Sequence, residues 1–257
     1  MVPILVFDIE TIPDVEGLRK LWDLGAELSD GGVVDLVSQR RRQATGNDFL
    51  PAHLQRVVAV SCVLRSNDGL KVWSLGGPQD TEAQVIQRFF DGIEKYTPQL
   101  VSWNGSGFDL PVLHYRALFH GIPGCCYWDT GEGNKDFKWN NYLSRFHARH
   151  TDLMDVLAGY QNRAFAPLDE IAQLSGLPGK LGMDGSQVYA AWKRGEIVAI
   201  RNYCETDVAN TFLLYQRFQL IRGLLDPAAY EAEVVLFRAF LAEQQAPHWK
   251  EFAAAWK

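Results

Sequence analysis

The chain has little cysteine, no excess of basic residues and no long hydrophobic run. Its four cysteines match no zinc-binding spacing, and the adjacent pair Cys125 and Cys126 does not suit a disulfide framework, so we expect a reducing, cytoplasmic location. No run approaches the roughly 18 to 20 apolar residues that span a bilayer, and the apolar stretch at the amino terminus is too short for a signal peptide. Membrane and disulfide-rich classes are therefore excluded.

The charge balance argues against one class of nucleic-acid-binding protein. With 25 Lys+Arg against 31 Asp+Glu, the formal net charge is -6, which does not suit a protein that coats nucleic acid by bulk electrostatics. A local site stays open, because carboxylates that gather divalent cations can hold a phosphate on an acidic protein. The composition, 47% hydrophobic and 22% charged, is that of a globular protein with enough apolar material for a packed core.

The distribution of apolar residues predicts an α/β fold. The first third of the chain is strand-rich, the last third is helical, and no linker or repeat separates them, so we expect one domain over 1–257 with a helical extension from about residue 222. Predicted strands cover 3–9, 56–65, 69–75 and 99–103. Predicted helices cover 81–96, 108–120, 152–160, 167–176, 186–194, 196–222 and 227–245, and a turn-rich insertion loop covers 121–141.

Two acids end the first predicted strand. Asp8 and Glu10 follow a near-continuous apolar run, and the two-residue period of a strand places both carboxylates on one face. Two like charges about 5 to 7 Å apart on an apolar strand repel each other and are costly to desolvate, and a divalent cation between them removes that cost. The alternative is a strand end that simply emerges into water. The same Asp-x-Glu string recurs at Asp14 and Glu16, after Pro13, where we expect a solvated loop.

Three further polar residues belong to later elements. Asp109 occurs where the strand over 99–103 gives way to a helix, so its carboxylate stands at a helix N-terminus and faces the carboxyl end of the sheet. Tyr203 and Asp207 are four apart in a helical stretch and share a face. Taken alone, Asp109 is an ordinary first-turn acid, and Asp207 is a surface acid beside a half-buried aromatic. Together with the first acid pair, they offer four carboxylates and a phenol at one edge of the sheet.

The ordered set resembles the three motifs of DEDD-type 3'-5' exonucleases. These motifs read Asp-x-Glu, then Asn-x-x-x-Phe-Asp, then Tyr-x-x-x-Asp, and the second and third each occur once in this chain, ending at Asp109 and Asp207. Asn202 stands five before Asp207, where the histidine type has His, so the chain is similar to the tyrosine type. The segments FDIET, WNGSGFDLPVL, HTDLMDVL and NYCETDVANT resemble the stand-alone predicted family B polymerase-like 3'-5' exonucleases, over roughly residues 1–215.

This resemblance implies an RNase H-like (DnaQ-like exonuclease) α/β fold, with a mixed sheet of five strands flanked by helices. Four strands are predicted above, and we expect the fifth near residues 149–152. The palm, fingers and thumb of a polymerase need several hundred further residues, so we expect an exonuclease without polymerase activity.

The resemblance also implies a two-metal-ion mechanism with Mg²⁺ or Mn²⁺, which a set of hard oxygen ligands favours over zinc. Asp8 would bridge both ions. Glu10 and Asp207 would hold the water-activating ion, and Asp109 would bind the other through its hydration shell. Tyr203 would orient the attacking water, and successive attacks at a 3' end would release nucleoside 5'-monophosphates. The positions that would hold the terminal nucleotide are Ile9, Thr11, Asn104 and Phe108.

A basic and aromatic segment over 135–150 is a further candidate for strand binding. Lys138, Arg145 and Trp139 combine positive charge with a stacking surface, which is what backbone tracking and base stacking require. The alternative is that the aromatic residues of this segment, Tyr142 among them, pack into the core and that its charges form a solvated face.

Several other polar residues are expected to be structural. Asp152, near a predicted helix start, is expected to cap that helix or to support the site rather than to bind metal. His147 and His150 are three apart with no further ligand spaced to help, so we expect ordinary surface histidines. The cluster Arg40 to Arg42 is expected on a surface helix.

The leading hypothesis is a metal-dependent 3'-5' exonuclease acting on 3' ends of single-stranded nucleic acid, with DNA favoured over RNA. No membrane partner is expected, and no protein partner is indicated. An exoribonuclease of the RNase D or oligoribonuclease kind would use the same four acids, but the second motif and Asn202 argue against it. A non-catalytic nucleic-acid-binding module would have no physical reason to keep buried like charges. An RNase H-like endonuclease has no use for Tyr-x-x-x-Asp.

Overall fold

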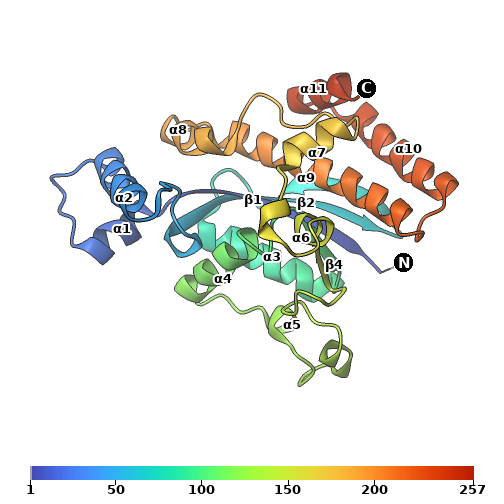
Figure 1. The fold of residues 1–257 in the computed structure, drawn as a ribbon, viewed down its shortest axis with the longest axis horizontal. Helices are drawn as coiled ribbons and strands as arrows, with labels where there is room; N and C mark the ends of the chain where they lie inside the picture. Colours follow the sequence, from blue (N-terminus) through green and yellow to red (C-terminus); the bar gives the residue numbers. More distant parts are fainter. Residues whose placement is uncertain (1) are drawn as a thin grey trace.

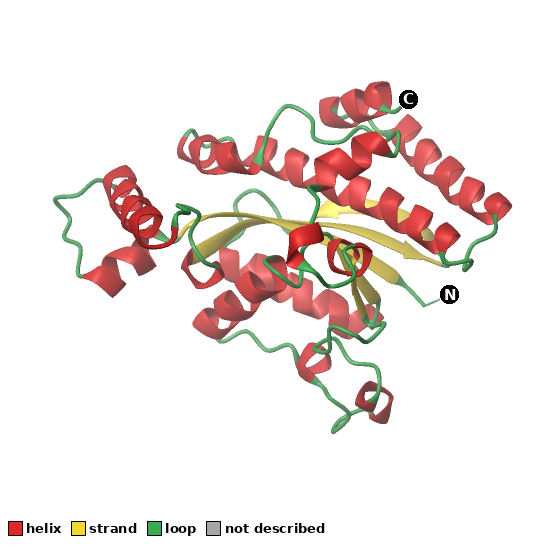
Figure 2. Ribbon diagram, in the orientation of Figure 1, coloured by secondary structure: helices red, strands yellow, loops and turns green. Residues whose placement is uncertain are grey.

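The computed structural model describes residues 2–257 and shows a mixed five-stranded sheet flanked by helices, as predicted (Figures 1 and 2). The strand order is β3-β2-β1-β4-β5, with β1 antiparallel to β2 and parallel to β4. β2 and β3 form an antiparallel hairpin, and β5 runs parallel to β4. The strands are β1 (Ile4–Pro13), β2 (Gln55–Ser66), β3 (Gly69–Ser74), β4 (Gln99–Ser102) and β5 (His150–Asp152). The fifth strand lies where the sequence analysis placed it.

The sheet separates two apolar layers, and the alternation along β1 shows how. Phe7 packs in one layer against α3 (Glu82–Tyr96) and α4 (Asp109–His120), while its neighbour Val6 packs in the other layer against α9 (Ile197–Ile221). Successive strand residues point to opposite faces, so one apolar strand supplies both cores. In Figure 1, α3 and α4 lie below the sheet, and α9 lies above it with α7, α10 and α11.

The remaining helices are short except near the carboxyl end. Their bounds are α5 (Cys125–Trp128), α6 (Leu153–Leu157), α7 (Leu168–Leu174), α8 (Val188–Lys193), α10 (Pro227–Glu243) and α11 (Pro247–Ala255), with 3-10 turns over η1 (Ala52–Leu54), η2 (Lys135–Lys138), η3 (Asn162–Ala164) and η4 (Gly185–Gln187). Among residues 2–257, no helix combines the length and the apolar character that crossing a bilayer would require.

Three differences from the predicted elements have clear physical causes. The helix expected over 152–160 is present but shorter, because Asp152 ends β5 and α6 stops at Leu157; Gly159 and Tyr160 both have positive φ, which a right-handed helix does not accept. The last helix ends at Glu243, and Pro247 begins a separate helix that the sequence analysis missed. The segment 121–141 holds α5 and η2 as well as loops.

A helical arm between β1 and β2 was also missed. It consists of α1 (Val15–Trp22) and α2 (Asp30–Thr45), which extend beyond the end of the sheet on the left of Figure 1 and enclose a small core of their own. The expectation of a solvated loop at Asp14 and Glu16 is therefore wrong for the loop and for Asp14, whereas Glu16 is exposed as expected. Asp14 is buried, accepts a hydrogen bond from the backbone N–H of Gly17 as the N-cap of α1, and pairs with Arg116 at 2.7 Å. Arg40 to Arg42 lie on α2, as expected.

Candidate active site

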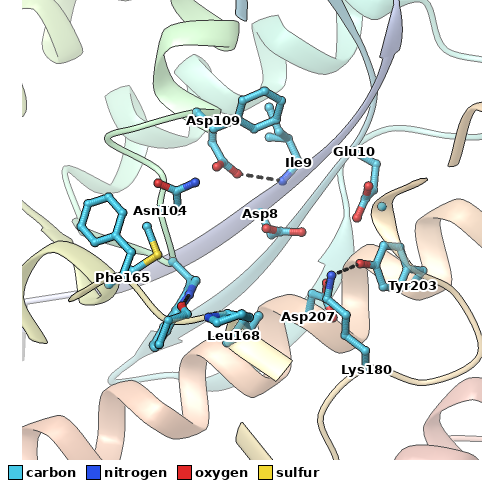
Figure 3. Close-up of a pocket in the computed structure, with 16 residues that line it drawn as sticks. Asp8, Ile9, Glu10, Asn104, Asp109, Phe165, Leu168, Lys180, Tyr203 and Asp207 are labelled. Atoms are coloured by element: carbon cyan, nitrogen blue, oxygen red, sulfur yellow. Dashed lines mark hydrogen bonds and ion pairs between the residues drawn. The ribbon is translucent and has the colours of Figure 1, made fainter. Parts of the chain in front are cut away.

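The acids from β1, α4 and α9 meet in one open pocket at the carboxyl end of β4, beside the middle of β1 (Figure 3). The cavity measures about 450 Å³. The two-residue period of β1 places Asp8 and Glu10 on the face that α9 covers, while Ile9 packs into the opposite core layer. The structure thus brings together all the predicted catalytic and metal-binding residues: Asp8, Glu10, Asp109, Tyr203 and Asp207.

Asp109 reaches the pocket as the first residue of α4. It is buried, and its Oδ1 accepts a hydrogen bond of 3.2 Å from the backbone N–H of Ile9, which ties the start of α4 to β1. Burial raises the pKa of Asp109 to about 7, although this hydrogen bond and the backbone of α4 favour the ionised form. An approaching cation would therefore favour loss of the Asp109 proton near neutral pH.

On α9, one face presents Tyr203, Cys204 and Asp207 toward β1. Residues three and four apart lie on the same side of a helix, which explains why all three reach the site. Cys204 is fully buried, and its Sγ lies 3.4 Å from the carbonyl oxygen of Asp8 and 3.5 Å from Asp8 Oδ2. Sequence reasoning gave this cysteine no role, although its place between the two motif residues was the signal.

Lys180 is the second residue that sequence reasoning missed. Its Nζ donates a hydrogen bond of 2.6 Å to the hydroxyl of Tyr203 and lies 3.8 Å from Asp207 Oδ2. The loop that carries it is held to α9, because the side-chain amide of Asn210 exchanges hydrogen bonds with the backbone of Gly179. A lysine in a glycine-rich stretch matches no spacing rule. The one available signal was that buried acids need a positive charge nearby, and this signal does not specify which lysine supplies it.

Electrostatics make this cluster unusual. Burial raises the pKa of both Asp8 and Glu10 well above the ordinary range, and neighbouring carboxylates raise them further. Burial also raises the pKa of Asp207, to about 6, against the opposing effect of Lys180. Within residues 2–257, Lys180 is the one basic side chain within 4.0 Å of these acids. The site therefore has an excess of negative charge when its acids are ionised.

The donor set fits a divalent cation. Asp207 Oδ1 is buried and accepts no hydrogen bond from the described part of the chain. An unpartnered buried carboxylate oxygen is costly, and a cation satisfies it. Carboxylate oxygens are the ligands that Mg²⁺ and Mn²⁺ prefer. The residues present thus suit these ions in number, charge and chemistry.

The predicted nucleotide-binding positions fall around the same acids. Ile9, Asn104 and Phe108 line the pocket, whereas Thr11 lines an adjoining cleft that shares Ile9 and Phe108 with it. This cleft is walled by Ser38 of the helical arm and by the segment that follows α2, which contributes Phe49. The ring of Phe49 lies 5.4 Å from that of Phe108 and is 54% exposed. Phe49 is a further residue that sequence reasoning did not single out.

Asp152 supports the site, as expected. Its carboxylate caps α6 and accepts hydrogen bonds from the backbone N–H groups of Asn104 and Ser106, at 2.9 and 2.8 Å. These bonds hold the turn between β4 and α4, in which Asn104 has the left-handed φ of 65°. Asp152 therefore fixes the loop that delivers Phe108 and Asp109.

The basic and aromatic segment divides in the structure. Trp139 is 79% exposed, with the Lys138 ammonium 5.3 Å from its ring centroid, and Arg145 pairs with Asp155 at 2.8 Å. None of these three lines the acid pocket, but Arg145 lines a neighbouring cleft that shares Asn104 with it. Tyr142 is buried in the core, as the alternative expected.

The expectation of surface histidines is wrong for His150. It is buried in β5, with its Nε2 2.8 Å from the hydroxyl of Ser102, and burial lowers its pKa to about 4. His147 accepts a hydrogen bond from the backbone N–H of Asn141 through Nδ1, which gives it a structural role.

Comparisons with known proteins agree with this geometry. Residues 47–256 match a family model described as a predicted 3'-5' exonuclease related to the exonuclease domain of PolB. The chain belongs to this family. The resemblance inferred from the motifs is thereby confirmed, although the first acid pair lies before the matched residues.

Two relatives of this exonuclease family are much longer than the segments matched. A DNA polymerase from Archaeoglobus fulgidus is 26% identical over 136 residues, covering 52% of this chain and 17% of that protein. The structure of the family B DNA polymerase from Pyrobaculum calidifontis aligns with a TM-score of 0.50 at 19% identity, covering 86% of this chain and 25% of that one. The chain thus spans a quarter or less of these relatives, and the structural match shows the shared fold.

Proposed function

We propose that this protein is a two-metal-ion 3'-5' exonuclease that hydrolyses single-stranded nucleic acid, with DNA preferred, and releases nucleoside 5'-monophosphates. One observation carries the proposal: four carboxylates converge in an open pocket with a single lysine nearby, and Asp207 Oδ1 has no partner there. Such a cluster is costly in a protein that binds no cation.

Asp8, Glu10 and Asp207 would hold one cation, and Asp8 with Asp109 a second, both Mg²⁺ or Mn²⁺. When bound, these ions would lower the pKa of a water and neutralise charge on the phosphate and the leaving 3' oxygen. Asp109 needs no large movement to bind, because the backbone N–H of Ile9 already holds its carboxylate. The burial of Glu10, Asp109 and Asp207 limits the screening of their charge by water.

Tyr203 and Lys180 act together on the attacking water. Burial raises the pKa of Tyr203 far above its usual range, so its hydroxyl stays protonated at neutral pH. Because Lys180 donates to the phenol oxygen, the hydroxyl proton points away from the ammonium, toward Asp207 or a water bound beside it. The ammonium also supplies positive charge beside Asp207 where phosphate charge develops.

The strand's terminal base fits between the acids and the helical arm. Phe49 and Phe108 present paired rings at the mouth of the cleft that adjoins Glu10, and aromatic rings stack on any base. The strand would leave on the other side through the cleft that Arg145 lines, since this cleft shares Asn104 with the acid pocket. A groove open at both ends of the pocket suits a single strand.

The decisive test is degradation of 5'-labelled single-stranded DNA and RNA with Mg²⁺, with Mn²⁺ and with chelator. We expect a metal-dependent ladder that shortens from the 3' end, faster on DNA, and no ladder from the double variant Asp8→Asn, Glu10→Gln. The control is Asp91→Asn, Glu251→Gln, which makes the same chemical change at two exposed positions.

Each outcome of this test has a meaning. Faster cleavage of RNA would assign an exoribonuclease, internal cuts would assign an endonuclease, and strand binding without cleavage by folded, metal-loaded protein would assign a binding module.

The base subsite has its own test in Phe49→Ala. Loss of one stacking surface, worth about 1–3 kcal/mol per base, should raise KM about tenfold and leave kcat nearly unchanged. Phe119→Ala, an exposed phenylalanine on α4 that lines neither cleft, is the control. An unchanged KM for Phe49→Ala would remove this subsite.

A further inference from the structure

A thiol lies within the acid cluster. Cys204 Sγ contacts Asp8 through both its backbone oxygen and Oδ2, at 3.4 and 3.5 Å. The ligand atoms of Asp8, Glu10 and Cys204 all lie within 4.8 Å of one another, so one cation can touch all three after small shifts. The proposed exonuclease chemistry makes no use of this sulfur.

A second observation points to a ligand at the same place. One turn along α9 from Cys204, Asp207 is buried, and its Oδ1 has no hydrogen-bond partner among residues 2–257. Asp207 lines the pocket with Asp8 and Glu10. Asp207 lies outside the three residues whose ligand atoms fall within 4.8 Å of one another, so its side chain must move toward a cation bound there to complete a set of one sulfur and three carboxylates.

We propose that this set is a binding site for thiophilic divalent cations, Zn²⁺ and Cd²⁺, and that their binding inhibits the exonuclease. The inference rests on the proposed function, since the same acids would hold Mg²⁺ or Mn²⁺ for cleavage. Mg²⁺ does not bind thiols well, whereas Zn²⁺ and Cd²⁺ take thiolate with carboxylate or imidazole. On binding, the sulfur–metal bond forms, the S–H bond breaks and the proton passes to solvent, with no change of oxidation state.

The position of the sulfur explains why this occupancy inhibits. Cys204 lies on α9, and its Sγ contacts Asp8 from that side of the pocket. A cation held there by sulfur is drawn toward α9 and occupies the oxygens of Asp8 that the catalytic ions need. Thiophilic cations would thus compete with Mg²⁺ and place their charge away from the pocket mouth.

The chain offers an internal control. Cys62 is also fully buried, but it packs with Phe7 in the layer between the sheet and helices α3 and α4, and it does not line the acid pocket. Cys125 and Cys126 lie at α5, one exposed and one half-buried. Replacing both with serine leaves one buried thiol at the acids and one buried thiol elsewhere, which isolates the contribution of Cys204.

The experiment titrates Cd²⁺ into the Cys125→Ser, Cys126→Ser protein and follows ultraviolet sulfur-to-cadmium charge-transfer absorption. We expect one Cd²⁺ per chain with this band, lost on adding Cys204→Ser and kept on adding Cys62→Ser. Absence of the band, or its survival in the Cys204→Ser protein, would overturn the proposal. Should Cys204→Ser fail to fold, Cys204→Ala and the cadmium NMR shift of the parent protein, which reports sulfur ligation, decide the question.

A second readout links the site to activity. Zn²⁺ should inhibit Mg²⁺-dependent cleavage by the parent protein, and Cys204→Ser should raise the half-inhibiting Zn²⁺ concentration at least tenfold; an equal value in both would also overturn the proposal. Failure of the proposed function is distinguishable, because a protein that cleaves nothing with Mg²⁺ or Mn²⁺ still reports through the cadmium band whether Cys204 is a ligand.

Discussion

The two acid pairs near the amino terminus share the Asp-x-Glu pattern, but the first acid of each pair has opposite surroundings. Asp14 meets the guanidinium of Arg116, which also binds Glu82, so its negative charge is balanced inside the protein. Asp8 and Glu10 meet further carboxylates and a thiol instead. Buried acids with a paired cation hold a structure together, whereas buried acids without one need an external cation.

The largest expected effect is a loss of cleavage, and it distinguishes the Asp8 and Glu10 pair from the Asp14 and Glu16 pair. Asp8→Asn should lower cleavage by about 10³-fold or more, because transition-state charge stabilisation of several kcal/mol is lost. The same variant should raise the melting temperature of metal-free protein, since it removes a like charge from a buried cluster. Differential scanning calorimetry with chelator and a cleavage assay give both numbers, and a lower melting temperature would contradict the view of this cluster as strained.

The second pair should respond in the opposite way. Arg116→Met leaves Asp14 and Glu82 buried without their cation and should cost about 3–5 kcal/mol of unfolding free energy. Cleavage by the protein that stays folded should be nearly unchanged. Arg88→Met breaks an exposed pair with Asp80 and should cost at most about 1 kcal/mol. Urea unfolding measures each; equal losses in the two variants would refute the distinction.

The shared faces of the site residues on β1 and α9 could be predicted from the sequence, because they depend on local patterns. The apolar run of β1 and its two-residue period place Asp8 and Glu10 on one face, and the four-residue spacing of Tyr203 and Asp207 places them on one side of α9. These rules need no knowledge of distant neighbours. They fail where burial is decided by another segment, as for Asp14, whose partner Arg116 is 102 residues away.

Other misses have the same origin. The helix α2 buries only Val33 and Val37, so its sequence carries a weak apolar period, and only a surface helix at Arg40 to Arg42 was expected there. His150 is polar in sequence but is buried because β5 closes the edge of the sheet beside β4. Lys180 reaches the acids from a loop, where no period constrains a side chain.

A third prediction sharpens the role of the single lysine. Lys180→Met should lower kcat about ten- to a hundredfold with little change in KM, because the water-orienting phenol loses its donor and the acids lose their nearest positive charge. Lys193→Met is a matched control, since Lys193 also lies over a tyrosine ring, that of Tyr189, but on α8 away from the acid pocket. Steady-state kinetics on labelled DNA measures kcat and KM for both variants. Equal effects of Lys180→Met and Lys193→Met would assign Lys180 a merely structural role.

The last prediction concerns the slope of stability against pH, and the sign of this slope separates free acids from cation-bound acids. Without metal, the folded chain keeps a proton on Asp109 up to about pH 7, whereas the unfolded chain releases it near pH 4. The unfolding free energy that Asp109 contributes therefore falls as pH rises through this window. His114 and His150, with pKa values lowered to about 4, change stability in the opposite direction, so the measurement must be a difference from Asp109→Asn.

In metal-free protein, Asp109→Asn should match the wild type near pH 4 and exceed its stability near pH 7. Saturating Mg²⁺ should remove or reverse this difference, because cation binding to the folded state favours the ionised carboxylate and adds stability at high pH. Urea unfolding across the window, with and without Mg²⁺, measures it. A difference that Mg²⁺ leaves unchanged would mean that Asp109 belongs with Asp14, as a structural acid, and would take the second cation out of the proposed mechanism.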